Sequence, residues 1–210
     1  MEKEKVLSNI EHTGVIAVIR AQSAEQALNM AENCLKGGID IIELAFTTPS
    51  PLAAIETLKK ELGGKITLGA GTVLDAPSAS AAMHCGADFI VSPHFDSEII
   101  KACNRNNVLS VAGFFTPTEG INAMAAGCDV LKLFPAQVLG PDFLKAILAP
   151  LPGAKVIPTG GIDADNIGAW LQAGAIAAGV GGKLLKGDIQ QNAHRLTAQI
   201  KAAREEESEK

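Results

Sequence analysis

The sequence is poor in aromatic residues: among 210 positions it has one Trp and no Tyr, and only 4% of its residues are aromatic. This scarcity argues against a surface that stacks single-stranded nucleic acid, because such surfaces are built from aromatic side chains. Hydrophobic residues still make up 47% of the chain, so small and branched apolar side chains must carry the packing. That composition is typical of buried parallel strands covered by helices.

The sequence also lacks a strong net charge, a long apolar run and paired cysteines. A net charge of −5 gives no reason to expect a polyanionic partner such as nucleic acid. No stretch reaches the roughly 18 uninterrupted apolar residues of a membrane span, and MEKEKVLSNI at the start has no apolar segment of a secretory signal. The four cysteines form no CxxC pair, so reduced thiols are expected. We therefore expect a cytoplasmic protein without nucleic-acid or membrane partners.

Four segments of the sequence resemble one another. Each passes from a glycine into a short apolar strand, and the four are GGIDIIELAF (37–46), CGADFIVSPH (85–94), AGCDVLKLFP (126–135) and AGAIAAGVGG (173–182). Segments of helical periodicity separate them from four further expected strands, which are GVIAVIR (14–20), KITLGAG (65–71), VLSVAGF (108–114) and KVIPTGG (155–161). Regular β–α alternation at this length favours a single α/β domain over residues 1–210, a (β/α)8 TIM barrel. An open doubly wound sheet is the alternative, although no Gly-rich fingerprint follows the first strand.

Local signals refine this prediction at three places. Residues 1–12 predict an extra N-terminal helix that closes the bottom of the barrel, and the charged residues 205–210 predict a solvated tail. TPTE (116–119) predicts a helix start with Thr116 as its capping residue.

The repeats place two charged residues at one offset. Three positions after the aspartates of DIIE and DVLK stand Glu43 and Lys132, and Val91 and Gly179 hold the equivalent positions in the other two repeats. Because equivalent positions on alternate barrel strands share a layer of inward-pointing side chains, Glu43 and Lys132 should face each other near the carboxyl ends of their strands. A buried structural ion pair is the alternative, but stability alone explains such a pair poorly.

This pair is suited to Schiff-base chemistry. Burial disfavours the charged form of an amine, and a neutral amine on Lys132 can attack a carbonyl group of the substrate. The resulting iminium draws electrons from a neighbouring carbon–carbon bond, and Glu43 is placed to move the protons. A covalent Schiff base on Lys132 needs no cofactor and no metal, and the four histidines show no ligand spacing.

Other strand ends supply candidate binding groups. Arg20 is expected to bind an anion, with a salt bridge on the rim as the alternative, and Thr72 in GAGT offers a hydroxyl group. The loops TGG (159–161) and GVGG (179–182) follow the last two strands just before helices, where TIM barrels bind phosphate; tight turns are the alternative. Pro93 and Phe134 are expected at the mouth, with core packing an equal alternative for Phe134. Lys183 and Lys186, which follow GVGG, could add positive charge there, but lysines at such positions are more often solvated.

These motifs resemble those of the 2-keto-3-deoxy-6-phosphogluconate (KDPG) / 4-hydroxy-2-oxoglutarate (KHG) aldolase family. They occur in order over nearly the whole sequence, as VIAVIR, GIDIIELAFTT, LGAGTV, ADFIVSPH, TPTE, VLKLFPA, PTGGI and AGVGG. The resemblance implies a homotrimeric class I aldolase without a metal. It would split KDPG to pyruvate and glyceraldehyde 3-phosphate, or 4-hydroxy-2-oxoglutarate to pyruvate and glyoxylate. The alternatives are an aldolase for another 2-keto-3-deoxy sugar acid (the galactonate epimer or a non-phosphorylated one) and a non-catalytic phosphometabolite-binding barrel.

The resemblance also implies roles for individual residues. Lys132 would form the pyruvyl Schiff base and Glu43 would transfer protons. The implied substrate-binding residues are Arg20 and Thr72 at the carboxylate, Pro93 and Phe134 at the pocket border, Thr159 at a position tied to stereochemical preference, and Gly160, Gly161, Gly181 and Gly182 in the phosphate loops.

Three places depart from the family pattern. Thr47 stands where many members have an arginine that contacts the pyruvate carboxylate, so Thr47 is the candidate there. Gly182 stands where the phosphate loop usually ends in serine, which removes one hydroxyl donor. In VAGFF (111–115), Ala and Gly replace the commoner Pro-Gly, and two phenylalanines follow. These departures leave the preferred keto acid open.

Overall fold

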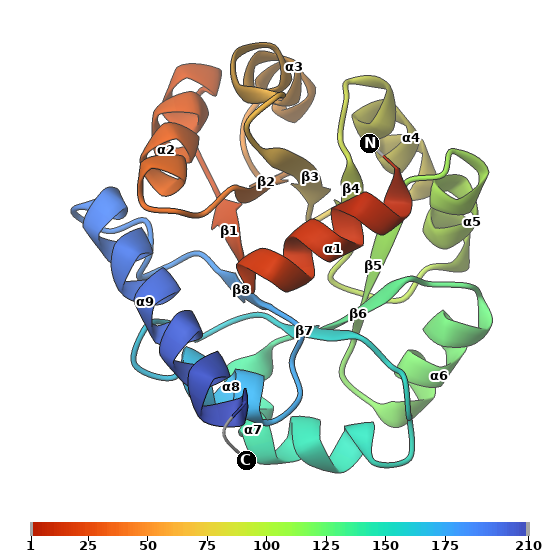
Figure 1. The fold of residues 1–210 in the computed structure, drawn as a ribbon. Helices are drawn as coiled ribbons and strands as arrows, with labels where there is room; N and C mark the ends of the chain where they lie inside the picture. Colours follow the sequence, from red (N-terminus) through yellow and green to blue (C-terminus); the bar gives the residue numbers. More distant parts are fainter. Residues whose placement is uncertain (1, 209–210) are drawn as a thin grey trace.

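Eight parallel strands roll into a barrel in this computed structural model, which describes residues 2–208 (Figure 1). The strands are β1 Val15–Ile19, β2 Ile41–Ala45, β3 Thr67–Gly71, β4 Phe89–Val91, β5 Leu109–Phe114, β6 Val130–Leu133, β7 Val156–Pro158 and β8 Ala178–Val180. Their order is β7-β6-β5-β4-β3-β2-β1-β8, and a bridge between Thr159 and Gly179 joins the two ends of that order. The prediction of a (β/α)8 barrel is therefore confirmed.

Helices surround this barrel, and one helix crosses its end (Figure 1). The helices are α1 Lys3–Thr13, α2 Ala24–Lys36, α3 Pro51–Leu62, α4 Ala76–His84, α5 Ser97–Arg105, α6 Pro117–Ala125, α7 Ala136–Leu148, α8 Ile167–Gln172 and α9 Ile189–Ser208. The predicted extra N-terminal helix is α1.

Alternation along the strands divides the apolar side chains between two cores. Outward-facing residues such as Leu44 pack with the surrounding helices. Inward-facing residues such as Ile16 and Val130 form a second cluster, which also contains the fully buried Val6 and Ile10 of α1. Because α1 lies across the amino-terminal end of the strands, the interior is closed there (Figure 1). A site within the barrel must open at the carboxyl ends.

Some element boundaries differ from the predicted ones. The capping box of Thr116 and Glu119 is present at the start of α6, as predicted. Helix α7 begins at Ala136, directly after the Phe134-Pro135 segment, and Gly140 interrupts it with φ 79° and ψ 167°. At the end of the chain, α9 continues to Ser208, so much of the expected tail (205–210) is helical; residues 209 and 210 lie outside the described residues.

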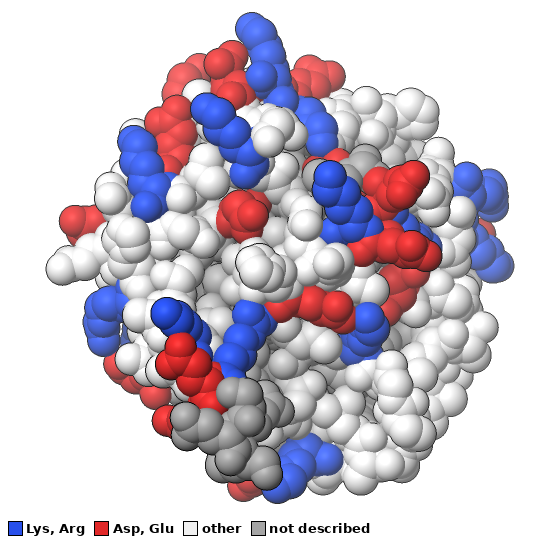
Figure 2. All heavy atoms as spheres, in the orientation of Figure 1, with Lys and Arg blue, Asp and Glu red and all other residues white. Residues whose placement is uncertain are grey.

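The charged side chains on the surface are mixed in sign, in agreement with the small net charge of the sequence. Lys and Arg side chains are interspersed with Asp and Glu on the face that α1 crosses (Figure 2). Within residues 2–208, no helix combines the length and apolar character needed to cross a membrane.

The four cysteines are free thiols, and burial raises the pKa of Cys34 and of Cys103 to about 12. Those two thiols therefore stay protonated near neutral pH.

Candidate active site

Lys132 and Glu43 meet inside the barrel, near the carboxyl ends of β6 and β2. Only 5% of Lys132 and 2% of Glu43 is exposed, and Lys132 Nζ lies 3.9 Å from Glu43 Oε1. That oxygen is buried and accepts no hydrogen bond from the described residues. A buried carboxylate oxygen without a hydrogen bond is unfavourable for stability, so the pair is better explained by a substrate or water that completes it.

Two glycines make room for polar side chains within the barrel. A Cβ atom on Gly71 would lie 1.9 Å from Glu43 Oε1, and one on Gly179 would lie 2.3 Å from the Thr159 hydroxyl oxygen. Gly179 holds the fourth repeat's equivalent of the Lys132 position, and the Thr159 hydroxyl group lies where a side chain on Gly179 would stand. Residues of β8 and of the segment after β7 therefore bring a third polar group into the interior.

A cavity of about 230 Å³ opens at the carboxyl ends of β1, β7 and β8. Its lining contains many of the predicted binding residues, which are Arg20, Phe134, Thr159, Gly160, Gly161, Gly181 and Gly182. Arg20 is exposed and reaches across to β8, since its Nη1 lies 3.6 Å from where a Cβ atom on Gly181 would stand. The half-buried Phe134 borders both regions, because its ring centroid is 5.2 Å from Lys132 Nζ. Lys132 and Glu43 do not line the cavity themselves, and Phe134 is the cavity residue that lies beside Lys132.

The two Gly-rich loops expose backbone to this cavity. Gly160 and Gly161 have φ values of 106° and 72°, which residues with a side chain rarely adopt. After β8, the Leu185 N–H donates to the Gly181 carbonyl at 3.1 Å and closes a turn. The expectation that helices follow these loops directly is wrong, because α8 and α9 begin only at Ile167 and Ile189. The loops themselves, and no helix terminus, line the cavity.

Thr72 and Pro93 lie on the other side of the mouth. Thr72 is half-buried and has φ 58°, an outlier for a β-branched residue of the kind that clusters at functional sites. Pro93 packs tightly on β5, where a Cβ atom on Gly113 would lie 2.1 Å from its carbonyl carbon. Of the two phenylalanines after Gly113, Phe114 is buried in the outer core and Phe115 is exposed. Neither belongs to the lining of the cavity at β1, β7 and β8.

Thr47 is exposed in the turn after β2, whereas its neighbour Thr48 is buried. The Thr48 hydroxyl accepts a hydrogen bond at 3.2 Å from the backbone N–H of Ala21. Thr48 therefore holds the segment that follows Arg20, a positioning contact that the sequence pattern did not reveal.

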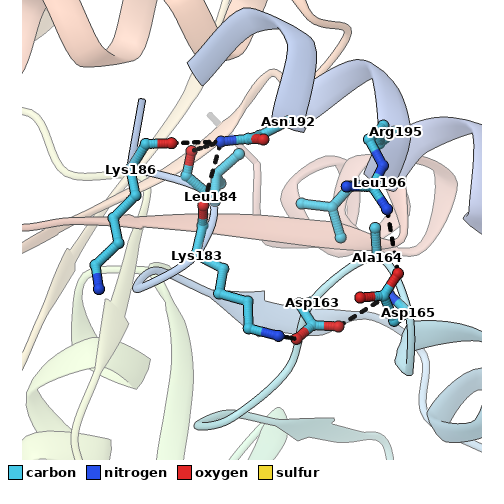
Figure 3. Close-up of a pocket in the computed structure, with 9 residues that line it drawn as sticks. All are labelled: Asp163, Ala164, Asp165, Lys183, Leu184, Lys186, Asn192, Arg195 and Leu196. Carbon is cyan, nitrogen blue, oxygen red and sulfur yellow. Dashed lines mark hydrogen bonds and ion pairs between the residues drawn. The ribbon is translucent and has the colours of Figure 1, made fainter. Parts of the chain in front are cut away.

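Asp163 is a cavity residue that the sequence analysis missed, and it forms an ion pair with Lys183 (Figure 3). Burial by itself raises the pKa of the Asp163 carboxyl, but hydrogen bonds from Lys183 and from the Asp165 N–H outweigh burial and lower that pKa below its usual range. An acidic residue two positions after TGG is the signal that could have drawn attention to it.

Known proteins share this architecture and sequence. Residues 6–200 match the family described as KDPG and KHG aldolase. A 2-dehydro-3-deoxy-6-phosphogalactonate aldolase of Escherichia coli (strain K12) is 31% identical, over 91% of this chain and 95% of that protein. A 2-dehydro-3-deoxy-phosphogluconate aldolase of Treponema pallidum (strain Nichols) is 33% identical, over 79% of each chain. A KDPG aldolase from Legionella pneumophila, solved with pyruvate captured at low pH as a covalent carbinolamine intermediate, superposes with a TM-score of 0.82 at 28% identity, covering 94% of this chain and 97% of that chain.

Proposed function

Because this chain belongs to the KDPG and KHG aldolase family, we propose that it cleaves a 2-keto-4-hydroxy acid through a Schiff base on Lys132. The observation that carries the proposal is the buried pair inside the barrel, with Lys132 Nζ 3.9 Å from a Glu43 oxygen that accepts no hydrogen bond from the described residues. The carbinolamine of the Legionella relative supports the same chemistry, since a carbinolamine precedes a Schiff base.

The proposed reaction uses both members of the pair. The Lys132 amine attacks the C2 ketone, and loss of water from the carbinolamine gives an iminium. Glu43 then takes the C4 hydroxyl proton and the C3–C4 bond breaks, so that its electrons pass into the iminium and leave an enamine and an aldehyde. Glu43 delivers a proton to C3 of the enamine, and hydrolysis releases pyruvate and the free lysine. Glu43 Oε1 is suited to these transfers because it lies 3.9 Å from Lys132 Nζ and accepts no hydrogen bond from the described residues.

The remaining predicted residues are proposed to hold the substrate. We assign its carboxylate to Arg20 and Thr72, with the exposed Thr47 as a further candidate at the rim. Pro93 and Phe134 would border the reacting carbons. Thr159 would contact the C4 hydroxyl group, and the loops that contain Gly160, Gly161, Gly181 and Gly182 would bind phosphate through their N–H groups.

KDPG and 4-hydroxy-2-oxoglutarate are the first proposed substrates. The galactonate epimer of KDPG is a second candidate, favoured by the 31% identity to the E. coli 2-dehydro-3-deoxy-6-phosphogalactonate aldolase. A pyruvate-release assay with all three compounds ranks them by kcat/KM. A kcat/KM for the galactonate epimer well above the other two would replace the first assignment with the second.

From the family pattern, we propose that the protein forms a homotrimer and is located in the cytoplasm. Exposed apolar side chains on α6 and α7, among them Ile121 and Val138, offer surface for such an assembly. Light scattering in solution tests this proposal, because the trimer has three times the 21.7 kDa mass of one chain.

Borohydride trapping tests the mechanism directly. Incubation with pyruvate and borohydride should add the mass of reduced pyruvate to a peptide that contains Lys132. Lys132→Met should abolish both the labelling and the release of pyruvate, while the fold is retained. Labelling at another lysine would reject the assigned residue. Absence of labelling together with retained binding of phosphorylated compounds would instead favour a non-catalytic binding barrel.

A further inference from the structure

Lys183 lies between two neighbouring cavities. One is the cavity of about 230 Å³ at the ends of β1, β7 and β8, and the other is a cavity of about 220 Å³ on the outer side of the β8–α9 loop (Figure 3). Lys183 and Asp163 line both of them, whereas Lys186 lines only the outer one. The Lys183–Asp163 ion pair therefore forms part of the wall of the proposed phosphate cavity.

The two partners of this ion pair differ in exposure and in the number of contacts that hold them. The Asp163 side chain is 11% exposed, and one of its oxygens accepts a hydrogen bond from the Asp165 N–H at 2.9 Å, which fixes the carboxylate. The Lys183 side chain is 72% exposed and sits on a flexible stem. Its hydrogen bond with Asp163 raises its pKa, so it stays cationic at neutral pH.

The backbone that carries Lys183 is held in place. Asn192 of α9 donates from Nδ2 to the carbonyls of Lys183, Leu184 and Lys186, at 3.2, 3.1 and 2.7 Å (Figure 3). This fixes the loop, so the side chain of Lys183 can reorient while the loop stays in position.

The charges around the proposed phosphate cavity require such a cation. A phosphate monoester carries about −1.5 to −2 charges near neutral pH, and Asp163 places a carboxylate in the same wall. Without Lys183, Arg20 would be the remaining cation in the lining. An ammonium group has three donors, so it can bind Asp163 and a phosphate oxygen together.

We propose that Lys183 sets the preference for phosphorylated substrates, because its ammonium group, held by Asp163 in the free enzyme, also binds the phosphate group of the substrate. The inference rests on the proposed aldolase function, and it adds to the glycine loops a side chain that the sequence analysis expected to be solvated. Lys183 touches the end of the substrate away from the reacting carbons, so its contribution should appear in binding and not in the chemical step.

The test compares Lys183→Met with Lys186→Met, a matched control that removes the same charge from the same loop. Figure 3 shows Lys186 apart from Asp163, with no ion pair drawn between them, and Lys186 does not line the phosphate cavity. Lys183→Met should lower kcat/KM for the phosphorylated substrate by about 10- to 100-fold, the loss expected for a charge-assisted hydrogen bond. It should change kcat/KM for 4-hydroxy-2-oxoglutarate by less than about twofold. Equal losses on both substrates, or an equal loss in the control, would overturn the proposal.

The double variant Lys183→Met/Asp163→Asn separates direct contact from simple neutralisation of Asp163. Direct contact predicts that the double variant stays impaired on the phosphorylated substrate, and recovery to the wild-type value would overturn it. Calorimetric binding of 3-phosphoglycerate gives a readout that needs no turnover, and Lys183→Met should weaken it by a similar factor. If the wild-type enzyme cleaved neither substrate, the aldolase proposal would fail while this binding measurement still decided the role of Lys183.

Discussion

The two ends of the barrel interior are built from the same strands but contain different chemistry. At the amino-terminal end, Phe89 and Val130 are buried in an apolar cluster that Ile10 of α1 helps to close. At the carboxyl end, Lys132 and Glu43 are equally buried, yet Glu43 Oε1 has no hydrogen-bond donor among the described residues. One end therefore satisfies its own packing, and the other holds a buried oxygen without a hydrogen bond from the described residues.

The change from apolar to charged inward-facing side chains takes two residues on each of two strands. β6 passes from Val130 in the closed end to Lys132 in the open end, and β2 passes from Ile41 to Glu43 in the same way. Because inward-facing positions recur every second residue, each step of two moves one layer toward the mouth. The comparison predicts that changes in the lower layer alter stability, whereas changes one layer above alter the reaction.

The largest effect is expected for Glu43→Gln in the upper layer. Gln keeps the size of the side chain but cannot take up or deliver the proton, so kcat should fall by about 10²- to 10⁴-fold. Thermal stability should stay close to that of the wild type. The substitution replaces the carboxylate with an amide, and Oε1 of the carboxylate accepts no hydrogen bond from the described residues. The measurements are pyruvate release and thermal unfolding, with borohydride trapping as a check that Lys132 remains reactive. An unchanged kcat would remove Glu43 from the mechanism.

Ile10→Ala tests the lower layer, and here the expected effect is on stability. Ile10 is fully buried against the closed end, so truncation should lower the free energy of unfolding by about 2–5 kcal/mol. The kcat should change by less than about twofold, because Lys132 and Glu43 lie one layer above the apolar cluster that Ile10 packs in. Denaturant unfolding and pyruvate release measure the two quantities. Ser8→Ala, at an exposed position of the same helix, is the control, and a large fall in the kcat of Ile10→Ala would contradict the separation of the two ends.

The layered interior could be predicted from the sequence because strands repeat with a fixed period. The common offset of Glu43 and Lys132 in two repeats was enough to predict that they face each other, and the structure places them 3.9 Å apart. The extra helix over residues 1–12 was also predicted, and it is α1. For the pair, the fixed period of two along a strand converts a shared sequence offset into a shared layer of the barrel.

The loops at the mouth could not be predicted as well, because no period governs their backbone. Thr47 and Thr48 are adjacent and alike, and only the turn after β2 decides that Thr48 is buried and Thr47 exposed. The ion pair between Asp163 and Lys183 joins two loops, and the two residues are 20 positions apart in the sequence. Helix starts after these loops were misplaced for the same reason, since Gly160 adopts φ 106°, a value that periodicity does not encode.

The smallest expected effect is a gain at the mouth, from Gly182→Ser. A Cβ atom on Gly182 would meet nothing within 4 Å, so a serine fits without displacing a neighbour. Its hydroxyl group would restore the donor that the family pattern usually has there. One neutral hydrogen bond is worth about 0.5–1.5 kcal/mol, which predicts a rise in kcat/KM for the phosphorylated substrate of roughly 2- to 12-fold. Gly182→Ala adds the same Cβ atom without the donor and should leave kcat/KM near the wild-type value. An equal rise in both variants would mean that lost backbone freedom, and not a hydrogen bond to phosphate, limits this loop.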